Sequence, residues 1–127
     1  MRRISAILAI LTGSLLALGE VQANWGDWQW WPWWLVDFVA AAMLVLGGAW
    51  SIARKRLGSI VLIAGWAFTA GMVWMSLAGN LADGVDPGRD ARMMGSYAML
   101  LAMLLGTSAA GLVLATIGTA RHINPTD

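Results

Sequence analysis

Side chains that carry catalysis are scarce in this sequence. Cysteine is absent, His122 is the single histidine, and only 12% of the residues are charged. These counts leave no thiol nucleophile, no disulfide and no cysteine-based metal site. A glycine-rich phosphate loop with its lysine is missing, and so is a nucleophile elbow. We therefore predict that the protein is not an enzyme and uses no cofactor or metal ion.

Tryptophan is the residue type with the most unusual spacing. Six of the nine tryptophans fall between residues 25 and 34. Indole is flat and amphipathic and donates one N–H, so it favours the interface between lipid and water. An aromatic belt at that interface is the simpler interpretation, and an aromatic cleft for a lipid, quinone, sugar or cation is the alternative. The candidate binding residues under the alternative are Trp28, Trp31, Trp34, Asp37 and Trp74.

Asp37 is the one charged residue inside an apolar stretch. It lies two residues into the stretch over 35–53, close enough to the edge to reach headgroups, water or Arg92. We therefore expect a structural role for it. No other acidic or basic residue falls inside a predicted span. This absence disfavours a proton pump or an ion-selective pore, because both usually need charged or carbonyl-lined positions at depth.

The composition assigns the chain to the integral membrane proteins. Hydrophobic residues make up 59% of its 127 residues, and the mean hydropathy is +0.68. A soluble domain of this size exposes too much surface to hide that much apolar area. Apolar stretches run over about 4–19, 35–53, 57–81 and 95–120. A backbone in hydrocarbon must satisfy its own hydrogen bonds, so each stretch is predicted to be a transmembrane helix.

These elements define the predicted fold, which is all-α. Residues 1–127 form a single membrane domain, and four transmembrane helices pack as an up-down antiparallel bundle. A rival interpretation concerns residues 1–23. Arg2 and Arg3 precede an apolar run of signal-peptide length, and Val21 and Ala23 offer small residues before a cleavage point at Asn24. Cleavage there would leave three helices and an outside N-terminus.

The distribution of charge predicts the orientation. Six of the eight cations fall on one side of the predicted bundle: Arg2, Arg3, Arg54, Lys55, Arg56 and Arg121. All of the acidic residues except Asp127 fall on the other side. Short loops rich in Lys and Arg stay in the cytoplasm, so we expect both termini there. The excess of arginine over lysine, with abundant alanine and glycine, favours a bacterial chain and therefore a bacterial inner membrane.

Small residues repeat every four positions along two of the spans. The first repeat is Ser5, Ala9, Gly13 and Ala17, and the second is Ala98, Ala102, Gly106 and Ala110. Stripes of this kind let two helix backbones approach closely. We predict that the first and fourth helices touch, within one chain or across a dimer, through the packing residues Gly13, Ala102, Gly106 and Ala110.

Three classes of function fit these features. The first is an accessory or structural subunit of an inner-membrane complex, and we favour it because the protein is small and its spans hold almost no charge. The second is an oligomeric small transporter or channel for a neutral or lipophilic substrate. The third is a lipid- or quinone-binding protein that uses the tryptophan-rich segment. The expected partners are membrane lipids and a second copy or other membrane subunits. A net charge of +1 gives no basic field for nucleic acid.

Overall fold

A computed structural model describes residues 1–23, 25, 31–55, 57–82 and 91–123, and these form four helices. The helices are α1 (Arg2–Ala23), α2 (Trp31–Ile52), α3 (Gly58–Ala82) and α4 (Ala91–Ile123). Each contains a stretch long and apolar enough to cross a membrane, which confirms the predicted all-helical class. Three helices, α1, α2 and α4, extend at least two residues beyond the apolar stretches expected from the sequence. In α1 and α4 the backbone hydrogen bonds continue past the point where the side chains become polar, because helix formation does not require an apolar sequence.

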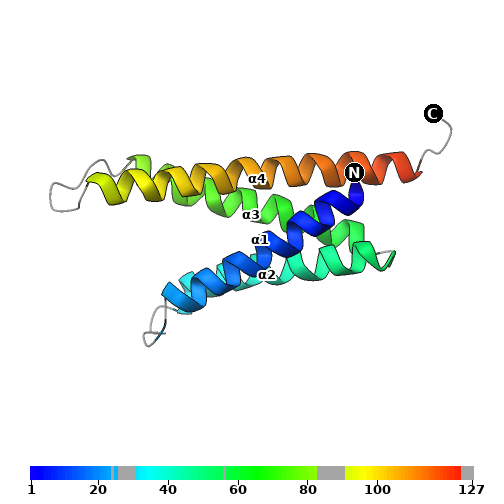
Figure 1. Cartoon of the computed structure of the whole chain (residues 1–127), viewed down its shortest axis with the longest axis horizontal. Helices are drawn as coiled ribbons and strands as arrows, with labels where there is room; N and C mark the ends of the chain where they lie inside the picture. The colour runs from blue at the N-terminus through cyan, green and yellow to red at the C-terminus, as the bar shows by residue number, and fades with distance from the viewer. Residues whose placement is uncertain (24, 26–30, 56, 83–90, 124–127) are drawn as a thin grey trace.

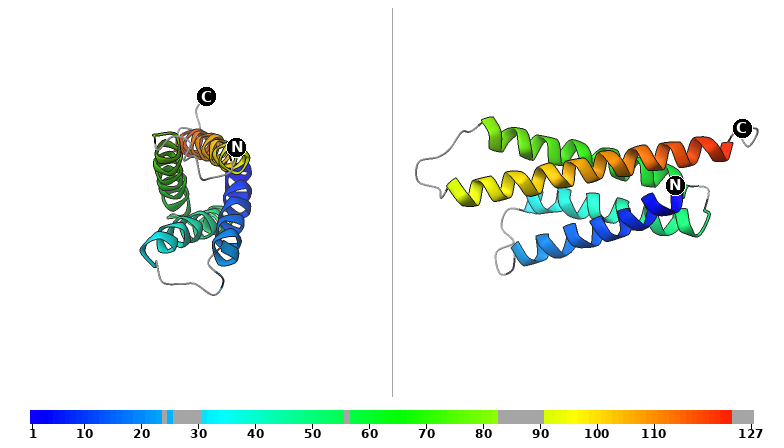
Figure 2. Two further views of the ribbon diagram at one scale, coloured as in Figure 1. Left: turned by 90° about the vertical axis from the view of Figure 1, so that its left-hand side faces the viewer. Right: turned by 45° about the horizontal axis from the view of Figure 1, so that its top comes forward.

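The helices pack in ring order (Figures 1 and 2). α1 lies against α2, α2 against α3 and α3 against α4, whereas α1 touches α4 over a shorter length. The register follows from close approaches. Gly13 faces Ala41 while Gly48 faces Ala6, so positions rise along α1 as they fall along α2.

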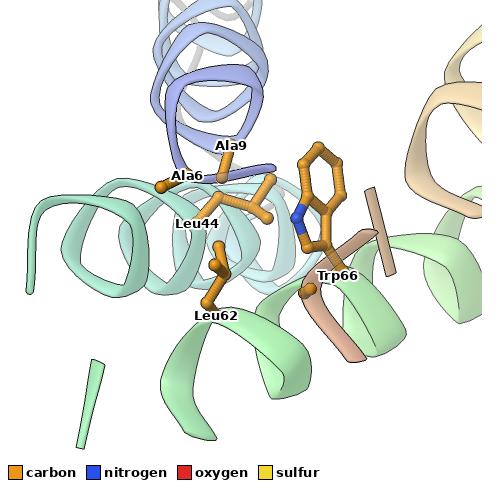
Figure 3. Close-up of a cluster of buried hydrophobic side chains, with 6 residues drawn as sticks. Ala6, Ala9, Leu44, Leu62 and Trp66 are labelled. Atoms are coloured by element: carbon orange, nitrogen blue, oxygen red, sulfur yellow. The ribbon is translucent and has the colours of Figure 1, made fainter. Parts of the chain in front are cut away.

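One end of the ring, the basic end, holds the start of α1, the end of α2, the start of α3 and the end of α4 (Figure 1). We call the opposite end the tryptophan end. A core formed by all four helices lies in the half nearer the basic end. It contains Ala6, Ala9, Leu44, Leu62, Trp66 and Ala115 (Figure 3). A second cluster of Val73, Leu77 and Leu101 joins only α3 to α4. The α1–α2 pair therefore separates from the α3–α4 pair toward the tryptophan end (Figure 1).

Two adjacent glycines explain why α2 contacts both α1 and α3 closely. A Cβ on Gly47 would lie 2.6 Å from the backbone nitrogen of Leu62 on α3, and a Cβ on Gly48 would lie 2.6 Å from the carbonyl oxygen of Ala6 on α1. Consecutive residues point about 100° apart around a helix. The two glycines thus leave two faces of α2 without side chains at the same level. The backbone of α3 packs against one face and the backbone of α1 against the other.

The end of α2 forms a Schellman turn. The Lys55 N–H donates to the Trp50 carbonyl at 2.9 Å, and the Arg54 N–H donates to the Ser51 carbonyl at 3.3 Å. Arg54 occupies the left-handed position of this turn, with φ at 56°, where glycine is usual. Gly58 then begins α3 in direct contact with the backbone of Trp50 and Ser51, where a Cβ has no room.

Candidate functional site

A buried polar contact joins three helices in the shared core. The indole Nε1–H of Trp66 on α3 donates to the Ser5 hydroxyl on α1 at 3.0 Å. That hydroxyl in turn donates to the carbonyl oxygen of Gly111 on α4 at 2.9 Å. Trp66 and Ser5 are both 0% exposed, so the hydrogen bonds satisfy polar groups that water does not reach.

The Trp66 ring fits here only because Gly111 has no side chain. A Cβ on Gly111 would overlap the six-membered half of the indole. Gly118, two turns further along α4, similarly accepts the backbone of Arg2, with a Cβ position 2.7 Å from the Arg2 nitrogen. The face that α4 presents to α1 and α3 therefore includes Gly111, Ala115 and Gly118.

The remaining buried hydroxyls make mostly local contacts. Thr69 donates to the Gly65 carbonyl at 2.8 Å, and Ser108 donates to the Leu104 carbonyl at 2.8 Å, each one turn back along its own helix. The Ser51 hydroxyl is buried without a hydrogen-bond partner in the described part of the chain. The described interior thus contains hydroxyl and indole groups but no ionisable side chain that is fully buried.

The predicted aromatic site is described only in part. Trp34 is half-buried near the start of α2 and meets Phe38 edge to face, with ring centroids 5.8 Å apart. Trp74 lies on α3 with 57% of its surface exposed. Trp28 lies outside the described residues, and so does the side chain of Trp31 in the first turn of α2. The described geometry therefore places Trp34 and Trp74 on different helix pairs.

Asp37 lies half-buried on α2, one turn after Trp34. Glu20 on α1 is close enough for the two carboxylates to interact electrostatically. The neighbour of Asp37 given by the structure is therefore an acid, because the antiparallel register brings the end of α1 beside the start of α2. The pairing with Arg92 expected from the sequence lies outside the described side chains.

The two small-residue stripes have different environments. Ser5, Ala9 and Gly13 are buried, and Gly13 approaches the Ala41 carbonyl of α2. On α4, by contrast, Ala102, Gly106 and Ala110 are exposed, and nothing lies within 4 Å of a Cβ placed on Gly106. The predicted contact between α1 and α4 is present, but within one chain it uses the Gly111 face of α4. The physical reason is that Trp66 needs the space at Gly111, and this rotates the Ala102–Ala110 stripe outward.

Sequence reasoning missed the Ser5–Trp66–Gly111 contact. The available signal was a tryptophan in the middle of an apolar span, where its N–H cannot reach water and must find an acceptor. In the part of the chain that the structure describes, no three His, Asp or Glu side chains gather as metal ligands. Comparison with family models, with curated proteins and with solved structures finds no match to this chain.

Proposed function

We propose that this chain is a bacterial inner-membrane protein that serves as a non-catalytic accessory or structural subunit of a membrane complex. Its four helices cross the membrane as an up-down antiparallel bundle, with both termini in the cytoplasm. The alternating register of the helix contacts and the apolar length of all four helices support this arrangement. The positive-inside rule supports the orientation, because the described cations at the basic end belong to short polar segments.

The outward stripe on α4 is the observation that carries the proposed role. Ala102, Gly106 and Ala110 form a smooth exposed ridge on a helix whose other face is already packed. Small residues do not improve packing against lipid tails. They do allow a second transmembrane helix to approach closely and to make more van der Waals contacts. The ridge fits a helix of another subunit or of a second copy.

The packing of the core favours this structural role over transport through one bundle. Trp66 contacts Gly111 directly and fills the centre of the four helices. Its N–H is already satisfied by Ser5, so a passing solute would have to break that contact. Among the described residues, the fully buried polar groups are hydroxyls and one indole, which do not bind ions strongly.

Substitution of Gly106 by Leu tests the proposal without disturbing the fold. A leucine at this position meets open space within the chain, so the thermal stability of the monomer should not change. It should weaken association by about tenfold or more, equivalent to about 1.4 kcal/mol. The measurement is the size of the complex and the proteins that co-purify with it in mild detergent.

Gly71→Leu provides a matched control. Gly71 is exposed on α3, and nothing lies within 4 Å of its Cβ position. Both variants therefore add the same bulk to a lipid-facing helix surface. Equal association of wild type and Gly106→Leu would contradict the proposed role, and so would equal loss in the two variants.

A lipid- or quinone-binding role is the second candidate. The distribution of the packed clusters favours it, because the cluster of Val73, Leu77 and Leu101 joins only α3 to α4, whereas the core shared by all four helices lies nearer the basic end. Trp34, held edge to face by Phe38, lies at the tryptophan end. Lipid or quinone retained by the purified wild type and lost from Trp34→Ala would support this role over the first.

A further inference from the structure

We propose that the basic end binds the phosphate headgroups of anionic phospholipids in the leaflet that it faces. This inference rests on the proposed membrane location and adds the chemical class of the lipid. The cations at this end whose side chains the structure describes are Arg2, Arg3, Arg54 and Lys55, and all except the half-buried Arg2 are exposed.

The fold brings these cations together from distant parts of the sequence. The Gly48–Ala6 approach places the first turns of α1 beside the last turns of α2, so the helix start that carries Arg2 and Arg3 and the turn that carries Arg54 and Lys55 lie at the same end of the bundle (Figure 1). The approach of Arg2 to Gly118 holds the start of α1 against α4 as well. Helix packing thus places the segments that carry these cations at one end of the bundle.

No carboxylate in the described part of the chain compensates this charge. The described acidic residues are Glu20 and Asp37, and both lie at the tryptophan end. Guanidinium and ammonium groups donate hydrogen bonds to phosphate oxygens, and anionic headgroups attract clustered cations near the membrane surface. The complementary ligand at this depth is therefore a lipid phosphate with a net negative charge.

The backbone of Arg54 is an independent indication that its cation has a role. A residue with a side chain is strained at φ 56°, and the left-handed position of a Schellman turn usually holds glycine. Arginine occupies this position in place of the usual glycine, which costs some conformational free energy within the turn. Strain of this kind concentrates at functional sites.

Lys55 is positioned for the same ligand. Its ammonium lies 5.7 Å from the centroid of the Trp50 ring, within range of a cation–π interaction. Tryptophan favours the headgroup level of a bilayer. The contact therefore keeps the ammonium at the depth of the lipid phosphates.

The test is a thermal-unfolding titration of the full-length protein in neutral detergent with phosphatidylglycerol, phosphatidylcholine or inorganic phosphate. Phosphatidylglycerol should raise the unfolding midpoint by several degrees, because a ligand that binds only the folded state stabilises it. Phosphatidylcholine and inorganic phosphate should each produce less than a third of that rise. An equal rise with either one would overturn the inference.

Arg54→Gly separates the lipid site from the fold. Glycine relaxes the turn, so the midpoint without added lipid should increase, while the rise caused by phosphatidylglycerol should fall by at least half. Lys55→Gln should reduce the response similarly. Arg89→Gly, which removes a cation from the α3–α4 connection, should leave it unchanged. A full response in Arg54→Gly would refute the assignment.

Extraction of membranes with alkaline carbonate distinguishes failure of this inference from failure of the proposed function. Release of the protein from the membranes would contradict the membrane location itself. Retention in the membranes, together with equal stabilisation by the two lipids, would contradict only the anionic-lipid site.

Discussion

Trp66 brings a hydrogen-bond donor into the middle of an apolar helix. Its Nε1–H has a single partner, the Ser5 hydroxyl at 3.0 Å, and both groups are fully buried. A buried donor that loses its acceptor destabilises a protein by about 1–3 kcal/mol, although hydrogen bonds between membrane helices average closer to about 0.6 kcal/mol. The loss of stability on removal of the Ser5 hydroxyl therefore depends on how completely the surrounding helices keep other hydrogen-bond acceptors away from the Trp66 N–H.

Ser5→Ala is predicted to lower the stability of the bundle by about 1 kcal/mol, because it leaves the indole N–H unpaired. Trp66→Phe removes the same donor, so a second change at Ser5 should cost less than it does in the wild type, because only the Ser5 bond to the Gly111 carbonyl is then lost. Chemical or thermal unfolding of the two single variants and the double variant measures the coupling. Strictly additive effects would show that the hydrogen bond does not contribute.

At the scale of the element, α1 is part of the core and not an appendage. It contributes Ala6 and Ala9 to the core shared by all four helices, and it accepts Gly48 of α2 against its backbone. Loss of α1 would uncover the groove on α2 at Gly48 and remove the acceptor of Trp66. These contacts favour retention of residues 1–23 over the interpretation of this segment as a signal peptide.

The mature protein is therefore predicted to keep residues 1–23. Intact-mass measurement of protein purified from the membrane should give about 13.6 kDa for the chain. Isolation of a stable, folded chain that starts at Asn24 would contradict this prediction. Replacement of Ala23 by a bulky residue serves as a control, since it blocks cleavage without touching the core.

At the scale of the whole molecule, the asymmetry between the two ends is the dominant feature. The cations whose side chains the structure describes lie at the basic end, where all four helices share a core, and the described carboxylates lie at the tryptophan end, where the helix pairs separate. The packed half and the positively charged half therefore coincide. One end of the molecule is therefore packed by all four helices, whereas the cluster nearer the other end joins only α3 and α4.

The orientation predicts where fused reporters are active. A reporter that fluoresces only in the cytoplasm, joined after Asp127, should be bright, and a periplasmic phosphatase at the same position should be inactive. The physical reason is the retention of Arg- and Lys-rich segments on the cytoplasmic side. Phosphatase activity at this position would reverse the assigned orientation, and a fusion within residues 83–90 provides the opposite control.

Much of the fold was accessible from the sequence alone. The four helices, their approximate bounds and the opposition of charge follow from apolar length and from the positions of Arg and Lys, because both depend on local solvation. The α1 stripe of Ser5, Ala9 and Gly13 was also identifiable, although its partner was not.

The tertiary structure alone decided which faces meet. The sequence pattern predicted contact through the Ala102–Ala110 stripe of α4, whereas the structure packs the face at Gly111 against Trp66. The tertiary structure likewise placed Asp37 near Glu20, because close approaches at Gly13 and Gly48 set the register of α1 on α2. Such choices depend on the shapes of side chains from distant segments, and periodicity within one helix does not contain that information.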